Sequence, residues 1–303
     1  MHTDIVSPDE LDKAVAGLPV QVWNAPTAAE LYGQTLNLVC RTRGGRTAGA
    51  WVVPLDDDGT AARRPFRLLP YASPWVDPEL HPVDRHRAVL SMTQALMDRV
   101  ESAEIPMDPR FGEAAALAEA GAELLCRHTR VLELHADRDP RTGYVATARN
   151  HIRAAAREHT VRTAPLDAFD FSRAVVGQPP DAVAARRRSG LRVGGVEPAL
   201  CLAATDPDGT CRGQVFVLLC DGAAVLMHSW FDRAGARGVP SLLVDEAIAW
   251  AGRQPGTDVF DFEGSVLPGV DRFMTGFGAR ACAYPQLRWR RSTEPGAGAG
   301  EFG

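Results

Sequence analysis

The stretch 257–278, TDVFDFEGSVLPGVDRFMTGFG, constrains the fold more than any other part of the chain, because it combines a buried strand, a turn and a helix. Apolar and acidic residues alternate in VFDF, which places Asp261 and Glu263 on one side of the strand and the phenylalanines on the other. Pro268 suits the first turn of a helix, whose apolar residues keep helical spacing until Gly278 ends it. The junction of a strand and a helix is a common place for a functional site in an α/β protein.

Both acidic side chains of this motif have a plain structural role open to them. Asp261 is expected to cap the turn. Glu263 either pairs with a nearby arginine or takes part in chemistry, and the motif by itself does not decide between the two roles.

The composition is that of a soluble globular protein, since 45% of the 303 residues are hydrophobic and 23% are charged. The length fits one large domain or two ordinary ones. No apolar run is long enough to span a bilayer, and the acidic lead-in at 1–25 does not resemble a secretory signal, so we expect a cytoplasmic protein without a membrane partner. The formal charge of -5 argues against broad, non-specific duplex binding and leaves only a local basic patch for contact with a nucleic acid.

The cysteines predict neither a metal site nor a redox site. All six are scattered, and no two form a CxxC pair. We therefore expect buried free thiols in a reducing compartment, no metal, and no tightly bound cofactor.

The first half predicts both strands and helices. Strands at 35–43 and 47–55 are separated by Gly44 and Gly45, which is a hairpin signal. The elements expected after them are a helix at 84–103, a strand at 105–107, a helix at 110–121 and a strand within 124–134.

The second half opens, after a charged turn, with a helix at 147–159. Arg149, Arg153 and Arg157 recur every four residues along it and form a basic stripe, which is either a solvated helix face or a contact surface. The elements expected after it are a mostly helical region at 165–191, strands at 199–205, 212–219, 224–231, 259–262 and 283–289, and helices at 241–253 and 268–278.

The two halves follow one order: a helix, an antiparallel run of strands, a longer helix, a strand, a short helix and a last strand. Their residues show no close identity, so the repeat is one of architecture. The sequence therefore predicts an α/β (α+β) fold of two tandem domains, 1–140 and 141–291, each with a mixed central sheet flanked by helices. The Gly/Ala-rich stretch 292–303 is expected to be a disordered tail.

Several segments resemble the Fem-type (FemABX-like) transferases, whose members carry two GNAT-fold domains in one chain. DFEGSVLPGVDRFMTGFGARACAYPQL resembles the family's DF-G-S…PG…RF…FG…Y signature, and GVPSLLVDEAIAWAGRQPGTDVFDFEG resembles its helix after a Pro-containing loop. RNHIRAA resembles the junction segment R…IRKA, with Ala154 in place of the lysine, and PYASPW resembles the aromatic loop of the first domain. The resemblance covers residues 30–290, and it implies two GNAT-like domains with the active site in the second. The family's long coiled-coil insertion is missing, which favours a smaller relative over an enzyme of peptidoglycan-bridge synthesis.

The resemblance also implies acyl transfer to an amine, with aminoacyl-tRNA or acyl-CoA as the donor. GNAT-type sites hold the acyl carbonyl in a splayed gap between two parallel strands, and the donor's phosphates rest at the N-terminus of the following helix. The corresponding elements here are the strand 224–231, the loop after it, and the helix from Ser241. That loop supplies Arg233, Arg237 and Gly238 but does not match the Q/R-x-x-G-x-G/A pyrophosphate loop cleanly, so aminoacyl-tRNA ranks above acetyl-CoA.

Under this resemblance Glu263 and His228 are the candidate catalytic residues. Glu263 binds the acceptor's ammonium group and takes a proton from it, and His228 accepts a proton or contacts the substrate, unless it is a hydrogen-bonded structural histidine. The candidate substrate-binding residues are Tyr71, Trp75, Trp230, Ser265 and Arg272. The candidate residues for donor phosphate or tRNA are Arg149, Arg153, Arg157, Arg233, Arg237, Gly238 and Ser241. Two alternatives stay open: packing of Tyr71 and Trp75 within the first domain, and a salt bridge from Arg272 to Glu263.

The leading hypothesis is a monomeric, aminoacyl-tRNA-dependent transferase that forms an amide bond on a small amine or peptide, as in peptide tailoring or antibiotic biosynthesis. Its partners are the acceptor end of an aminoacyl-tRNA and the amine. One alternative keeps the fold and uses acetyl-CoA as an N-acyltransferase does. A second alternative is a non-catalytic double-GNAT protein that binds a partner or a ligand.

Overall fold

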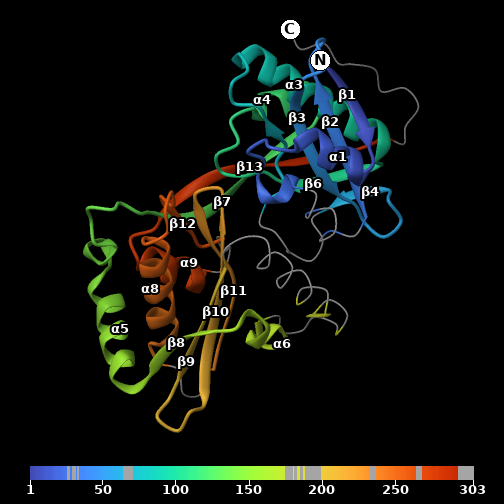
Figure 1. The fold of residues 1–303 in the computed structure, drawn as a ribbon. Helices are drawn as coiled ribbons and strands as arrows, with labels where there is room; N and C mark the ends of the chain where they lie inside the picture. The colour runs from blue at the N-terminus through green and yellow to red at the C-terminus, as the bar shows by residue number, and fades with distance from the viewer. Residues whose placement is uncertain are drawn as a thin grey trace.

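Two β-sheets carry the fold of the computed structural model (Figure 1). The structure describes residues 1–25, 28, 32, 34–63, 71–174, 180, 183–184, 187, 199–232, 237–263 and 268–292. Within these residues, a sheet of four strands has the order β1-β2-β3-β5, and a sheet of nine strands has the order β4-β6-β13-β7-β12-β11-β10-β9-β8. The predicted mixed α/β architecture is confirmed.

The first half of the chain forms the four-stranded sheet and one end of the nine-stranded sheet. Its elements are β1 (His2–Val6), α1 (Pro8–Val15), η1 (Val22–Asn24), β2 (Thr35–Arg41), β3 (Thr47–Pro54), β4 (Ala61–Arg63), β5 (Trp75–Val76), α3 (Pro82–Arg99), β6 (Ser102–Pro106), α4 (Ala114–Glu119) and β7 (Glu123–Glu133). The predicted hairpin and the long helix are confirmed as β2–β3 and α3. The prediction missed β1, which pairs antiparallel with β2, because the N-terminal stretch is polar and reads as a lead-in.

The second half forms the other end of the nine-stranded sheet. Its elements are η2 (Pro140–Gly143), α5 (Ala146–Glu158), β8 (Thr160–Ala164), η3 (Leu166–Ala168), α6 (Phe171–Ala174), β9 (Ala199–Thr205), β10 (Cys211–Cys220), β11 (Ala223–Phe231), α8 (Val239–Ala251), β12 (Val259–Asp261), α9 (Pro268–Thr275) and β13 (Arg280–Arg290). The helix–strand–helix order predicted around DFEGS is confirmed. Most of the helical region predicted at 165–191, and the tail after residue 292, lie outside the described residues.

Each half ends in a long strand that pairs with the other half. From the first half, β7 pairs antiparallel with β12, and from the end of the chain β13 pairs antiparallel with β6. The two long strands also pair with each other over nine positions (Figure 1). One continuous sheet therefore joins the halves, while the predicted domain boundary near residue 140 stays a prediction.

The two faces of this sheet bury different side chains, because neighbours along a strand point to opposite faces. On one face Ala224 and Phe260 pack in a core that includes α8. On the other face Val225 packs in a core shared with Tyr71 from the first half. Asp261 alternates with Phe260, so its carboxylate is directed toward the first half.

All six cysteines are free. Cys40, Cys201 and Cys220 are buried, as predicted for free thiols. Cys126 is exposed, so the prediction of burial is wrong for it: β7 turns this side chain to solvent.

Candidate active site

The parallel strands β11 and β12 separate after a short pairing. Three pairs join them, the last being Val225 with Asp261. From there β11 continues to Phe231, whereas β12 ends. A bulge at Met227 further bends β11, since the register with β10 shifts there. β11 therefore extends past the end of β12, at the place where the family resemblance implies a gap between the two strands.

The turn after β12 is held in an uncommon backbone conformation. Glu263 has a φ of 62°, in the left-handed region that a residue with a side chain avoids. Its N–H donates to Oδ1 of Asp261 at 2.8 Å, which confirms Asp261 as the cap of this turn. Glu263 is half-buried, and its backbone is held in a strained turn directly after the end of β12. Ser265, predicted to bind substrate, lies outside the described residues.

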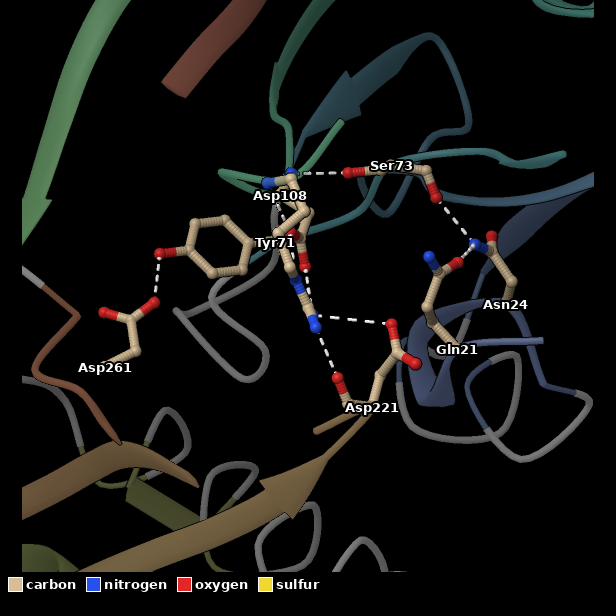
Figure 2. A network of polar contacts seen from close by, with 8 residues as sticks. Gln21, Asn24, Tyr71, Ser73, Asp108, Asp221 and Asp261 are labelled. Carbon is tan, nitrogen blue, oxygen red and sulfur yellow. Dashed lines mark hydrogen bonds and ion pairs between the residues drawn. The ribbon is translucent and has the colours of Figure 1, made fainter. Parts of the chain in front are cut away.

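Asp261 is the centre of a hydrogen-bond network that joins the halves (Figure 2). The Tyr71 hydroxyl donates to its Oδ2 at 2.7 Å, and the Thr129 hydroxyl donates to its Oδ1 at 2.6 Å. Burial raises the pKa of the Asp261 carboxyl, although the hydrogen bonds from Thr129 and Tyr71 act in the opposite direction. Burial and the neighbouring carboxylate also raise the pKa of Tyr71 above its usual value, so the phenol stays protonated and remains a donor.

A second polar cluster contains Asp108 and Asp221 (Figure 2) and is held together by Arg110. Its Nε and Nη2 donate to the two carboxylate oxygens of Asp108, both at 3.0 Å. The guanidinium also reaches across to the second half, where it donates to the main-chain oxygen of Asp221 and lies 3.4 Å from its carboxylate. Asp221 occupies the tight turn between β10 and β11, and Asp108 follows the end of β6. This charged bridge fixes the spacing of the two halves beside the Tyr71–Asp261 pair.

The network surrounds a cavity of about 200 Å³ between the halves. The first half supplies Trp23, Tyr71, Asp108, Pro109, Arg110 and Val131, and the second half supplies Cys220, Ala223, Val225, Val259, Asp261, Arg280 and Cys282. Asp108 and Arg110 also line a neighbouring cavity of about 300 Å³. The inner cavity lies against the paired stretch of β11 and β12, from Ala223 and Val259 to the last pair, Val225 with Asp261.

The start of α8 lies on the opposite face of the sheet and packs against α5. Gly238 is its N-cap, with a φ of 79° and no side-chain hydrogen bond to the first turn. A Cβ at this position would lie 2.6 Å from the carbonyl oxygen of His151, so only glycine allows this approach of the two helices. No side chain within the described part of the chain caps the first turn of α8, and free N–H groups at a helix start bind anions. Arg237, predicted for donor phosphate, is exposed beside them, whereas Ser241 is buried.

The predicted basic stripe is not part of this contact. Ala155 is buried and lies near Gly238, and the helical period places Arg153 and Arg157 on the other side of α5, where both are exposed. Arg149 is half-buried and donates to the main-chain oxygen of Tyr144. The stripe therefore forms an outward basic surface. Arg233 lies outside the described residues.

Two more of the predicted residues, His228 and Trp230, lie on β11. His228 is half-buried among aromatic rings, 5.5 Å from Phe171 and 6.2 Å from Phe216 between centroids. Trp230 donates to Gln214 at 2.8 Å, and the Arg173 guanidinium stacks over its ring at 3.8 Å.

The aromatic loop of the first half is mostly packed. Trp75 is buried in the same core as Tyr71. It therefore packs within the protein, which is the alternative that the sequence left open for it. Arg272 is exposed, and among the described residues it forms no salt bridge with Glu263. Its neighbour Asp271 pairs instead with Arg130, at 2.7 and 2.8 Å.

Sequence reasoning missed five residues of the network: Trp23, Asp108, Arg110, Thr129 and Asp221. Only Asp221 carried a signal, since Asp-Gly marks the turn between β10 and β11. The others are brought together by the pairing of distant strands. Among the described residues there is no group of three or more potential metal ligands and no helix long and apolar enough to cross a membrane.

Comparisons with solved structures agree on the fold. FemX covers 96% of this chain and 97% of its own, at 11% identity and a TM-score of 0.66. A tandem GNAT protein from the clavulanic acid biosynthesis pathway covers 97% and 99%, at 16% identity and a TM-score of 0.56. L-PGS from Bacillus licheniformis covers 95% and 92%, at 9% identity and a TM-score of 0.55. The chain therefore has the Fem-like tandem GNAT fold. No protein-family model and no curated protein matches the sequence.

Proposed function

We propose that this chain is an acyltransferase that moves an aminoacyl group from aminoacyl-tRNA to the amine of a small molecule or peptide. The observation that carries the proposal is that β11 continues past its last pair with β12, Val225 with Asp261, and leads into α8, whose N-terminus no side chain of the described residues caps. A carbonyl in the gap can accept hydrogen bonds from strand N–H groups, and a phosphate can bind at the helix N-terminus. The Fem-like tandem GNAT fold supports assigning the acyl carbonyl to the gap beside β11 and the donor phosphate to the N-terminus of α8.

In the proposed reaction the amine nitrogen attacks the carbonyl carbon of the aminoacyl ester. A C–N bond forms, the C–O bond to the tRNA ribose breaks, and the ribose oxygen takes up a proton. Glu263 accepts the proton that the ammonium group loses, since it is the acidic residue of the Asp261-capped turn that directly follows β12. The aromatic box around His228 favours a role in shaping the acceptor side over proton transfer.

Acetyl-CoA is the second candidate donor. The same helix N-terminus can bind a pyrophosphate, and the structure of the clavulanic acid tandem GNAT protein is described as being without AcCoA. A CoA-dependent enzyme needs the α8 N-terminus but not the outward stripe of α5, which separates the two donors experimentally.

The test is a donor assay with purified protein, a pool of radiolabelled aminoacyl-tRNAs and a cell extract that supplies acceptors. We expect one tRNA to lose its label to an RNase-resistant small product. Replacing both Arg153 and Arg157 by alanine should weaken discharge and lower the slope of log rate against log salt by about 1.5, because two phosphate contacts are lost. Arg87→Ala, which removes an exposed arginine from α3, is the matched control and should leave the slope unchanged.

Consumption of acetyl-CoA without discharge of any tRNA would assign the second donor instead. If neither donor is consumed, and Glu263→Gln leaves the biological role intact, the chain is a non-catalytic binding protein.

A further inference from the structure

Arg173 of α6 is stacked on a tryptophan ring and is not neutralised by an acidic side chain. Its Cζ lies 3.8 Å from the centroid of the Trp230 ring. The arginine is exposed, and among the described residues no carboxylate forms an ion pair with its guanidinium. A guanidinium stacked on an aromatic face keeps the N–H groups at its edge free, in the planar fork that binds a carboxylate or a phosphate.

The two acidic residues closest to this pair in the sequence are engaged elsewhere. Oδ1 of Asp170 accepts hydrogen bonds from the N–H of Ser172 at 3.0 Å and from the main-chain N–H of Arg173 at 3.3 Å. This carboxylate therefore holds the backbone of the turn before α6 and does not reach the guanidinium. Asp232, which follows β11, pairs with Arg212 at 2.8 Å. The positive charge of Arg173 thus stays open to an anion from outside the described chain.

The ring under the guanidinium is fixed by hydrogen bonds to a buried glutamine. Trp230 is 6% exposed, and its Nε1 donates to Oε1 of Gln214 at 2.8 Å. The same oxygen accepts the N–H of Asp170 at 2.9 Å, and Nε2 of Gln214 donates to the main-chain oxygen of Ala168 at 2.9 Å. The glutamine therefore joins β10, the ring and the segment before α6 into one unit. Because Arg173 is already stacked on this unit, it has less freedom to lose on binding an anion than an unsupported surface arginine has.

This unit lies beside the gap that the proposed function assigns to the acyl carbonyl. Trp230 is five positions past Val225, the last residue of β11 that pairs with β12. α6 lies on the side of β11 opposite α8 (Figure 1), and Trp230 packs in the core that contains Val225 and Tyr71. At about 3.3 Å per residue, the distance along β11 from Val225 to Trp230 is about 16 Å, the length of about five extended residues. An amine at the start of the gap and an anionic group at Arg173 therefore fit the two ends of one extended ligand.

We propose that Arg173, supported by Trp230, binds an oxyanion of the acceptor, either a carboxylate or a phosphate. The acceptor of the proposed reaction is then an amine that carries an anionic group at its far end, such as a short peptide with a free carboxyl end. The role of this ligand as acyl acceptor rests on the proposed function. Binding of its oxyanion at Arg173 does not, since it needs only the contacts of the stacked guanidinium.

The test is isothermal titration calorimetry with three peptides and no acyl donor. The probes are pentaalanine with a free carboxyl end, pentaalanine with an amidated end, and an amidated peptide of four alanines and a final phosphoserine. They share the amine and the length and differ in the last group. We expect the free acid and the phosphopeptide to bind about tenfold more tightly than the amide, because each adds a charge-assisted hydrogen-bond pair. The tighter of the two identifies the oxyanion as a carboxylate or a phosphate.

Variants assign this preference to one side chain. Arg173→Gln removes the charge and should bring all three peptides to the affinity of the amide. Arg173→Lys keeps the charge and loses the planar fork, so it should keep only part of the preference. Arg162→Gln removes an exposed arginine of β8 and is the matched control, which should leave all affinities unchanged. Melting curves show whether each variant is folded.

Three results overturn the proposal: no peptide binds, all three bind equally, or the preference for an oxyanion persists in Arg173→Gln. The guanidinium would then only pack on Trp230, and its loss would lower the melting temperature without changing the selectivity. Because no donor is present, a failed donor assay with an intact, Arg173-dependent preference rejects the proposed function alone. Discharge of a tRNA without that preference rejects this inference alone.

Discussion

Replacing Tyr71 by phenylalanine removes one hydroxyl from the Asp261 network and leaves the ring in place. The hydroxyl donates to Oδ2 at 2.7 Å in a site where Asp261 is 4% exposed, so water does not replace it. A hydrogen bond to a charged group contributes about 1.5–3 kcal/mol, so we expect the free energy of unfolding to fall by about 2 kcal/mol at a pH above the folded-state pKa of Asp261. Urea denaturation measures this loss directly.

The loss depends on pH in a direction that the structure fixes. Burial raises the pKa of Asp261 in the folded state above its unfolded value, so the folded protein binds the proton more tightly. Stability therefore rises as the pH falls from above the folded pKa toward the unfolded one. Tyr71→Phe removes a bond that favours the charged form, which raises the folded pKa further. We expect the destabilisation to be largest above the folded pKa and to shrink on acidification.

A double-mutant cycle with Asp261→Asn isolates the pair. In the background of that second substitution the carboxylate is gone, and Tyr71→Phe should cost clearly less than in the wild-type chain. Equal losses in the two backgrounds, or a loss that grows on acidification, would refute the reasoning that the hydroxyl stabilises a buried carboxylate.

Three further predictions concern the parts that hold the site. Arg110→Ala should lower the free energy of unfolding by about 2 kcal/mol in urea, because Asp108, with 4% of its side chain exposed, loses its ion pair. Gly238→Ala should lower the melting temperature more than Gly256→Ala, since both glycines have positive φ but only Gly238 meets a main-chain oxygen. Glu263→Gly should raise stability by about 1 kcal/mol while slowing amide formation on the order of 100-fold, whereas Glu263→Gln should slow it without the gain.

The sequence predicted the local structure around the site well, because that structure depends on neighbours. Alternation of apolar and acidic residues predicted β12, helical spacing predicted α9, and Asp261 caps the turn between them as expected. The fold class followed from the order of elements and from the family resemblance.

The partners of Asp261 were not predictable in this way. Tyr71 lies 190 positions away in the chain, and Thr129 lies 132 positions away. Thr129 reaches Asp261 because β7 pairs with β12, and the sequence of neither strand indicates which strand lies beside it. Trp75 and Tyr71 occupy one aromatic loop and read alike in the sequence, yet only the hydroxyl of Tyr71 reaches the network.

The exchange of the last strands gives the first half a role in the site. Its residues Tyr71 and Arg110 hold Asp261 and Asp221 of the second half, and β7 pairs with β13 along the line where the halves meet. The strands β11 and β12 and the α8 N-terminus belong wholly to the second half, whereas the cavity has walls from both. In the proposed reaction the second half therefore places the acyl donor, while Tyr71 and Arg110 of the first half hold Asp261 and Asp221 beside it, so a chain cut between the halves would lose these contacts even where each half folded.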